Sequence, residues 1–169
     1  MMTPMRVAVA VALALAVLAG QARAASPPGV RDARLSEIAT ALVGKPVTVR
    51  CASFETLREI SGADNAGVTV YATRTIYFAT PGCDVLAQVK GRPLVRSTWG
   101  GASLLTFVHE TWHLRGVSDE SETECRALRE IGQVAIQRFG VTNRKWLHDA
   151  IGYAWVGHRS LPAVYTRLC

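Results

Sequence analysis

The chain is poor in methionine, in lysine and in long apolar runs, and these shortages exclude certain kinds of metal site, partner and membrane insertion. Its three methionines are Met1, Met2 and Met5, so no methionine follows the first few residues. Arginine supplies 16 of the 19 basic residues, and these neither form a run nor alternate with aromatic residues. We therefore expect no nucleic acid partner. No stretch beyond the first 24 residues is apolar enough to span a bilayer, so we expect no stable membrane insertion of the mature protein.

The first 24 residues have the three parts of a secretory signal peptide. Met1–Arg6 is a short basic start, and Val7–Ala19 is an apolar run that is short for a membrane span. Ala22-Arg23-Ala24 then offers a cleavage site of the small-x-small type. No cysteine follows this site and no twin arginine precedes it, so neither a lipid anchor nor folded export is indicated. We expect cleavage after Ala24 and a secreted, extracellular protein.

The remaining 145 residues are enough for one domain with its own core. Residues 25–30 include Pro27-Pro28-Gly29, and we expect them to form a mobile arm. Residues 31–169 contain no internal repeat and no low-complexity segment, and we expect them to form a single domain.

The chain contains four cysteines, Cys51, Cys83, Cys125 and Cys169. An even number of cysteines in an exported protein indicates disulfides, and no CxxC pair is present to offer a thiolate metal site. Four cysteines allow three pairings. We favour Cys51–Cys83 with Cys125–Cys169, because each bond then closes within one half of the domain.

Hydrophobic periodicity and glycine or proline punctuation predict an α+β fold, with a small antiparallel sheet, helices and two stabilising disulfides. Gly100-Gly101 is interpreted as the break before a helix that begins at Ala102. The expected helices cover residues 32–43, 54–60, 83–89, 102–114, 120–139 and 143–156, and the expected strands cover residues 47–51, 67–72 and 75–79, the last two as a hairpin.

Residues 109–113 read His-Glu-Thr-Trp-His and carry most of the functional information. In a helix, His109 and His113 lie one turn apart on one face, where both can bind a single zinc ion. Glu110 then stands beside the first ligand, within reach of a water on the metal, where it can act as general base. The pattern predicts one zinc ion per chain.

A catalytic zinc ion usually has three protein ligands, and the third is expected soon after Gly116, which can end the first helix. Here the chain resembles the gluzincin branch of the zinc metallopeptidases, because Glu120, Thr123 and Glu124 match that branch's pattern on the next helix. The resemblance implies Glu120 as third ligand and Glu124 as an acceptor that orients a ligand histidine.

Other carboxylates remain open as the third ligand. Read through Gly116 to Asp119, the segment also resembles the metzincins, in which an aspartate takes that position. Metzincins need a methionine-containing turn beneath the metal, and the chain has no methionine there. Glu122 and Glu124 are further alternatives on the same predicted helix.

The resemblance covers roughly residues 100–130 and implies a minimal zincin-like core and a secreted zinc metallopeptidase. Its substrate would be a peptide or protein, paired with the edge strand of the sheet, for which residues 75–79 are the candidate. Zinc would activate water, Glu110 would take its proton, and a further donor would stabilise the oxyanion. The candidates for that donor are His148, Tyr153, His158 and Tyr165.

Two other functions are compatible with the same residues. The chain can be an exported, non-catalytic domain with disulfides and a structural or degenerate zinc site, although such a site gives no reason for Glu110. Hydrolysis of a non-protein amide, such as one in cell-wall peptide, would use the same chemistry.

Overall fold

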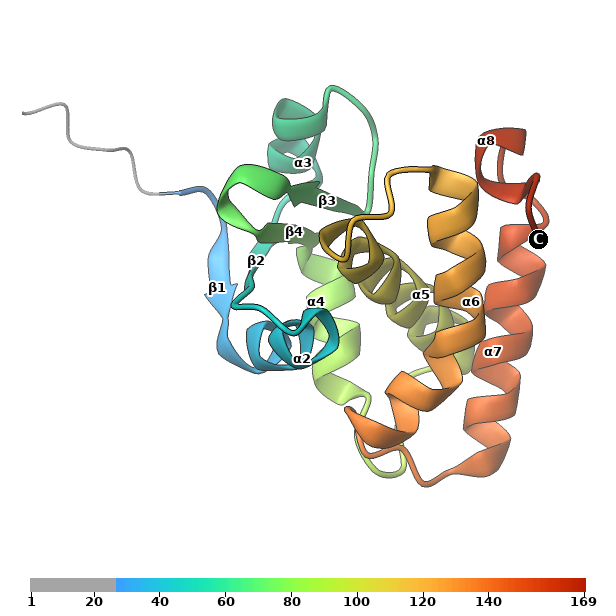
Figure 1. The fold of residues 1–169 in the computed structure, drawn as a ribbon. Coiled ribbons are helices and arrows are strands. Elements are labelled where there is room, and N and C mark those ends of the chain that lie inside the picture. Colours follow the sequence, from blue (N-terminus) through green and yellow to red (C-terminus); the bar gives the residue numbers. More distant parts are fainter. Residues whose placement is uncertain (1–26) are drawn as a thin grey trace, which may run out of the picture.

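A computed structural model of the protein describes residues 27–169, so the expected signal peptide and the first residues of the expected arm lie outside the described part. The architecture is α+β, with helices packed around a small sheet (Figure 1). In chain order the elements are β1 (Val30–Asp32), α2 (Ala33–Val43), β2 (Thr48–Ala52), α3 (Phe54–Ser61), β3 (Gly67–Val70), the 3₁₀ turn η1 (Tyr71–Thr73), β4 (Thr75–Ala79), α4 (Thr80–Gln88), α5 (Ser97–Leu114), α6 (Glu120–Gln137), α7 (Arg144–His158) and α8 (Ala163–Thr166).

The sheet is mixed, so the prediction of an antiparallel sheet was wrong in part. Its strand order is β1-β2-β4-β3. β1 pairs with β2 and β3 pairs with β4 in antiparallel fashion, but β2 and β4 run parallel, with Val49 opposite Ile76. The chain leaves β2 through α3, forms β3 at the outer edge, and returns as β4 between β3 and β2. A crossover through a helix is how two parallel strands are connected.

The strand order also corrects the expected edge strand. Residues 75–79 form β4, which is hydrogen-bonded on both sides and buried along its whole length. The edge strand is β3, which packs against α5. A strand that is paired along both of its edges has no free backbone groups for a substrate, whereas an edge strand has one free row.

The other edge strand, β1, holds the start of the described chain. Val30, the last residue of the expected arm, is the first residue of β1 and pairs with Cys51 of β2. The guanidinium of Arg50 donates hydrogen bonds to the carbonyl oxygens of Pro27, Pro28 and Gly29. The chain is therefore fastened to the sheet from Pro27 onward.

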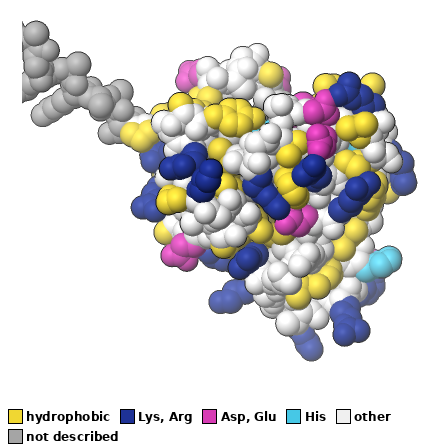
Figure 2. Space-filling view, viewed as in Figure 1, with side chains coloured by type: hydrophobic (Ala, Val, Ile, Leu, Met, Phe, Trp, Pro, Cys, Tyr) yellow, Lys and Arg dark blue, Asp and Glu magenta, His cyan; other side chains and the backbone are white. Residues whose placement is uncertain are grey.

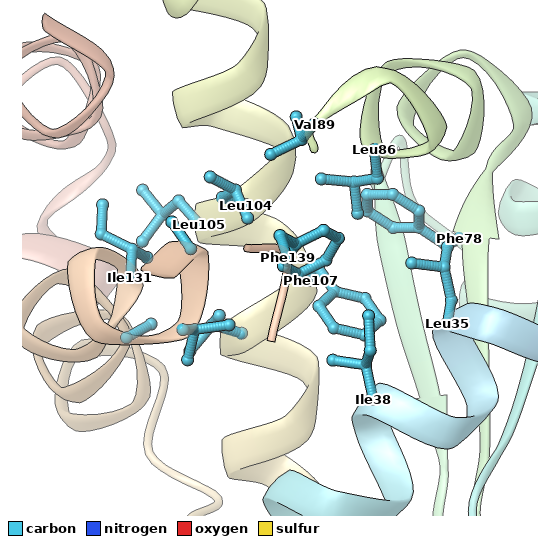
Figure 3. Packing of buried hydrophobic residues seen from close by; sticks show 14 of the residues in the cluster. Leu35, Ile38, Phe78, Leu86, Val89, Leu104, Leu105, Phe107, Ile131 and Phe139 are labelled. Atoms are coloured by element: carbon cyan, nitrogen blue, oxygen red, sulfur yellow. The ribbon is translucent and has the colours of Figure 1, made fainter. Parts of the chain in front are cut away.

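The core lies between the sheet and the helices, and α5 runs through it with α6 and α7 on its other side (Figures 1 and 3). Phe107 of α5 is fully buried, with its ring edge-on to Phe78 of β4 and to Phe139 after α6, at centroid distances of 6.2 and 6.1 Å. Because the motif helix is embedded in the core, the functional face of α5 is held by rigid packing.

α5 begins at Ser97, earlier than expected, and the Gly100-Gly101 pair lies inside it. A Cβ on Gly101 would stand 2.2 Å from the backbone oxygen of Ala150, and one on Gly100 would stand 2.3 Å from the Trp146 ring. The indole nitrogen of Trp146 also donates to the carbonyl of Val95, at 2.7 Å. The two glycines thus allow α7 to approach α5 closely, and this packing compensates for their poor helix propensity.

Both predicted disulfides, Cys51–Cys83 and Cys125–Cys169, are confirmed. The first joins β2 to α4, and the second joins α6 to the last residue of the chain. On the face shown in Figure 2, Lys and Arg side chains are scattered among hydrophobic and acidic ones. From residue 27 onward, no helix combines the length and the hydrophobicity needed to cross a bilayer.

Candidate metal centre

The second half of α5 carries the three residues of the motif. His109, Glu110 and His113 are buried, with 7%, 6% and 7% of their surface exposed. The two imidazole rings lie one turn apart, and their centroids are 4.7 Å from each other. Their Nε2 atoms are separated by 3.0 Å, so both point to a common position.

A short turn brings the first residue of α6 to the same position. α5 ends at Leu114, Gly116 adopts a φ of 96°, and α6 begins at Glu120. Oε2 of Glu120 lies 3.0 Å from Nε2 of His109 and 3.5 Å from Nε2 of His113. These three ligand atoms lie within 4.8 Å of one another, and the three residues form a group that could hold a metal ion.

Two of the alternative third ligands, Asp119 and Glu122, make other contacts. Asp119 is the N-cap of α6, where its side chain accepts from the backbone N–H of Glu122 at 2.9 Å and also pairs with Arg167. The side chain of Glu122 pairs with Arg126. Successive helical residues point about 100° apart, so only one of these neighbours can face the histidines, and that residue is Glu120.

The second nitrogen of each histidine has its own acceptor. Nδ1 of His109 donates to Oε2 of Glu124 at 2.8 Å, and Nδ1 of His113 donates to the carbonyl of Val117 at 2.8 Å. In a neutral imidazole this arrangement leaves the lone pair on Nε2, which is the nitrogen that faces the common position. Two such nitrogens and a carboxylate oxygen match the ligands that zinc prefers, and acceptors behind the histidines are characteristic of metal sites.

Charge at the centre favours a bound cation. Burial lowers the pKa of His109, but hydrogen bonds to the carboxylates of Glu120 and Glu124 outweigh it and raise that pKa from 6.5 to about 9. The hydrogen bond from His109 lowers the pKa of Glu120, so this carboxyl group remains ionised. The carboxylates of Glu120 and Glu124 thus supply negative charge on both sides of His109, which a metal ion could balance in place of the extra proton of the ring.

Glu110 lies next to the group without joining it. Burial raises the pKa of its carboxyl group. The Thr69 hydroxyl on β3 donates to Oε2 of Glu110 at 2.7 Å. A Cβ on Gly67, also on β3, would stand 2.8 Å from Cγ of Glu110. The edge strand therefore orients this carboxylate from close range, and only glycine leaves it room.

A cleft of about 680 Å³ opens over the group. Tyr71 and Tyr165, which are 94 residues apart in the sequence, both line it. The Tyr71 ring lies 6.5 Å from that of His113, and the Tyr165 ring lies 6.2 Å from that of His109. Tyr153 and His158 also line the cleft. His148 does not: it is exposed and lies beside Asp149, which removes it from the expected oxyanion donors.

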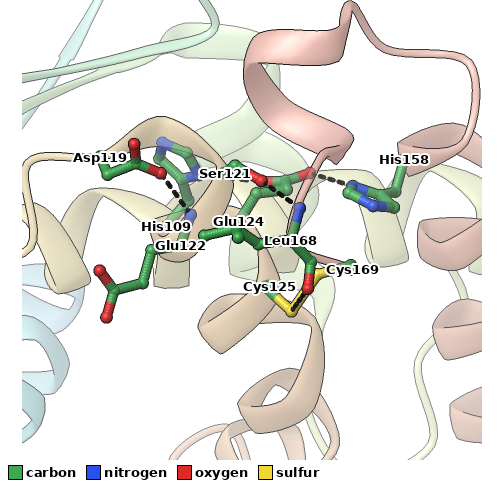
Figure 4. Close-up of a disulfide and its surroundings, with 9 residues drawn as sticks. All are labelled: His109, Asp119, Ser121, Glu122, Glu124, Cys125, His158, Leu168 and Cys169. Atoms are coloured by element: carbon green, nitrogen blue, oxygen red, sulfur yellow. Dashed lines mark hydrogen bonds and ion pairs between the residues drawn. A yellow bond between two sulfur atoms is a disulfide. The ribbon is translucent and has the colours of Figure 1, made fainter.

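Behind the first histidine, Glu124 lies between His109 and His158 (Figure 4). Its Oε1 atom is 3.6 Å from Nδ1 of His158, and both residues are buried. Beside them the end of the chain is fastened to α6: the N–H of Leu168 donates to the hydroxyl of Ser121 at 2.8 Å, and Cys169 is bonded to Cys125. This segment carries Tyr165, which is how a residue so distant in sequence reaches the cleft.

The sequence did not indicate the roles of Thr69, Gly67 or Tyr71, because they reach the centre only through the placement of β3 against α5. Comparison of the chain with protein-family models, with curated proteins and with solved structures gave no match. Any function of the chain must therefore be inferred from the geometry of this centre.

Proposed function

We propose that the protein is a secreted zinc-dependent metallopeptidase. One observation supports this most strongly. The two Nε2 atoms and the Glu120 carboxylate converge on one position, while Glu110 lies beside them and forms no ion pair with a Lys or Arg of residues 27–169. Three protein ligands with a nearby free carboxylate are typical of hydrolytic zinc sites, whereas structural sites have four protein ligands and no need of a base.

His109, His113 and Glu120 would hold the zinc ion. When bound, zinc supplies Lewis-acid activation of the scissile carbonyl and of a water molecule. Glu110 accepts the proton of the attacking water and passes it to the leaving amine. Its raised pKa suits both steps, because a carboxylate with an ordinary pKa is a weaker base. The Thr69 hydroxyl holds one oxygen of Glu110, which limits rotation of the carboxylate.

The substrate would be an extended peptide that lies along β3. This strand forms the edge of the sheet, and its residues Gly67, Val68 and Thr69 line the cleft. An added strand would pair with the free backbone groups of β3 and pass the metal group. We favour Tyr165, one of the expected donors, and Tyr71, which the structure adds, as donors to the oxyanion, because their rings lie beside those of His109 and His113. Burial and the nearby carboxylates raise the pKa of both phenols and keep them protonated.

The two disulfides support the export part of the proposal, since such bonds persist in oxidising compartments.

The test combines metal analysis with an activity assay. The purified mature protein is dialysed, its zinc content is measured, and it is incubated with casein and with a mixed peptide pool, with and without a chelator. The proposal expects one zinc per chain and cleavage that the chelator abolishes and added zinc restores. Tightly bound zinc without cleavage of any substrate would instead support an exported, non-catalytic domain with a structural zinc site.

A further inference from the structure

A second hollow adjoins the cleft, at the other half of α5. It is a groove of about 700 Å³ between the start of α5, the loop before it, β4 and α4. Asp84 and Arg96 are its charged lining residues, and most of the others are apolar. Three large hydrophobic side chains stand exposed around it: Leu94 at 96%, Trp99 at 60% and Phe54 at 54%. Large exposed apolar side chains gathered around one groove indicate a binding surface.

The groove and the cleft share a wall. Ala66, Ala102 and Thr106 line both, and all three side chains are small. On α5 the residues of the two hollows follow one helical stripe, at intervals of four and three: Trp99, Ser103, Thr106, Glu110 and His113. One face of a single helix thus leads from the apolar groove to the metal group.

The distance along this face between the groove and the metal group determines which residue of a bound peptide would reach the groove. Trp99 and His109 are ten residues apart on α5, which corresponds to about 15 Å along the helix axis. An extended peptide advances about 3.3 Å per residue, so this distance equals roughly four or five peptide residues.

We infer that the apolar groove binds a bulky hydrophobic side chain of the substrate, four or five residues from the bond that is cleaved. This inference rests on the proposed function and adds a substrate class to it: extended peptides with a large aliphatic or aromatic residue at that distance. The continuity of the two hollows supports a peptide as the occupant, because a chain that lies along β3 is led past Ala66 and Thr106 into the groove.

The test uses the zinc-loaded mature protein and a pool of peptides derived from a proteome, with cleavage sites identified by mass spectrometry. The expected result is enrichment of Leu, Ile, Phe or Trp at one position four or five residues from the cleaved bond. Absence of cleavage by the wild type would contradict the proposed function itself. Cleavage without such a position would overturn only the groove inference.

Variants then test the groove directly. Leu94→Glu and Trp99→Ala remove apolar surface at exposed positions, and Ile136→Glu is the control, because Ile136 is 53% exposed on α6 and lines neither hollow. For a long peptide with the preferred residue, kcat/KM should fall about tenfold to a hundredfold in the groove variants, as expected for the loss of one buried aliphatic side chain. For a tetrapeptide, too short to reach the groove, kcat/KM should stay within about twofold.

Zinc content and thermal unfolding should be unchanged in all three variants. An equal loss on long and short peptides would overturn the inference, and so would the same loss in Ile136→Glu. It would also be overturned if the groove variants kept full activity on the long peptide but lost binding to anionic lipid vesicles or lost self-association, because the groove would then serve a membrane or a second copy.

Discussion

Nδ1 of His109 lies 2.8 Å from Oε2 of Glu124, and this contact fixes which nitrogen of the imidazole faces the metal group. Glu124 is buried, and its other oxygen lies 3.6 Å from His158. The carboxylate would thus act on a bound metal ion through the histidine that it orients. Acceptors in this position make the histidine a stronger ligand.

Replacing Glu124 should therefore weaken zinc binding without removing a ligand. Glu124→Gln keeps the size of the side chain but removes its charge, and we expect zinc affinity to fall about 10- to 100-fold. Competition with a chromophoric chelator measures the change. Glu130→Gln on the same helix is the matched control, since Glu130 pairs with Arg115 away from the cleft and its loss should leave affinity unaltered. Equal affinities in Glu124→Gln and the wild type would contradict the role of Glu124.

Asp119 caps α6, whereas its neighbour Glu120 is the expected third ligand, and one variant of each residue distinguishes the two roles. Glu120→Ala should lose tightly bound zinc, because it removes one of the three converging ligand atoms. Asp119→Ala should keep one zinc per chain and lose about 1 kcal/mol of stability, because it removes the N-cap of α6. Metal analysis and thermal unfolding of both proteins check this. If Asp119→Ala loses the metal and Glu120→Ala keeps it, the ligand assignment is wrong.

Zinc binding should release a proton from His109. In the metal-free protein the pKa of His109 is raised to about 9, so its ring is protonated at neutral pH, and zinc needs the deprotonated nitrogen. The apparent affinity for zinc should therefore fall as the solution becomes more acidic and rise with pH until about 9. This group contributes about tenfold per pH unit below that value. Chelator competition between about pH 6 and pH 8 measures the slope, and a flat profile would contradict the raised pKa.

The close approach of α5 and α7 depends on Gly101. Its missing Cβ would stand 2.2 Å from a backbone oxygen of α7, so Gly101→Ala should separate the helices and lower the free energy of unfolding by about 1–3 kcal/mol. Gly152→Ala on α7 is the matched control: a Cβ there meets nothing within 4 Å, and alanine favours the helix, so stability should stay equal or rise. Urea unfolding of both variants compares them. A Gly101→Ala protein as stable as the wild type would show that this contact does not constrain the packing.

The sequence was most informative where the relevant geometry is local. The spacing of His109 and His113 needs only a helical turn, and the position of Glu120 needs only the break at Gly116 and the cap at Asp119. All of these features lie within 12 consecutive residues. The two disulfide pairings were also predicted correctly, because the prediction assumed that each bond links cysteines in the same half of the chain, and both bonds do.

What the sequence could not provide depends on contacts between distant segments. Hydrophobic patterns do not specify strand order, so β4 was mistaken for the edge strand. A pair of glycines usually indicates the end of a helix. Gly100 and Gly101 lie inside α5, and only their close approach to Trp146 and Ala150 explains why. Tyr165 lies 56 residues after His109, and it reaches the cleft because the chain end is fastened to α6.

Glu110→Gln is the decisive variant for our proposal that Glu110 is the base in hydrolysis at zinc. The two side chains have nearly the same size, and Glu110 is not among the converging ligands, so zinc content and thermal unfolding should match the wild type. Cleavage of the same peptide by both proteins is then compared at equal zinc loading. We expect kcat to fall at least about 10²–10⁴-fold in Glu110→Gln, because the proton acceptor beside the attacking water is lost. Equal cleavage by the two zinc-loaded proteins would contradict it.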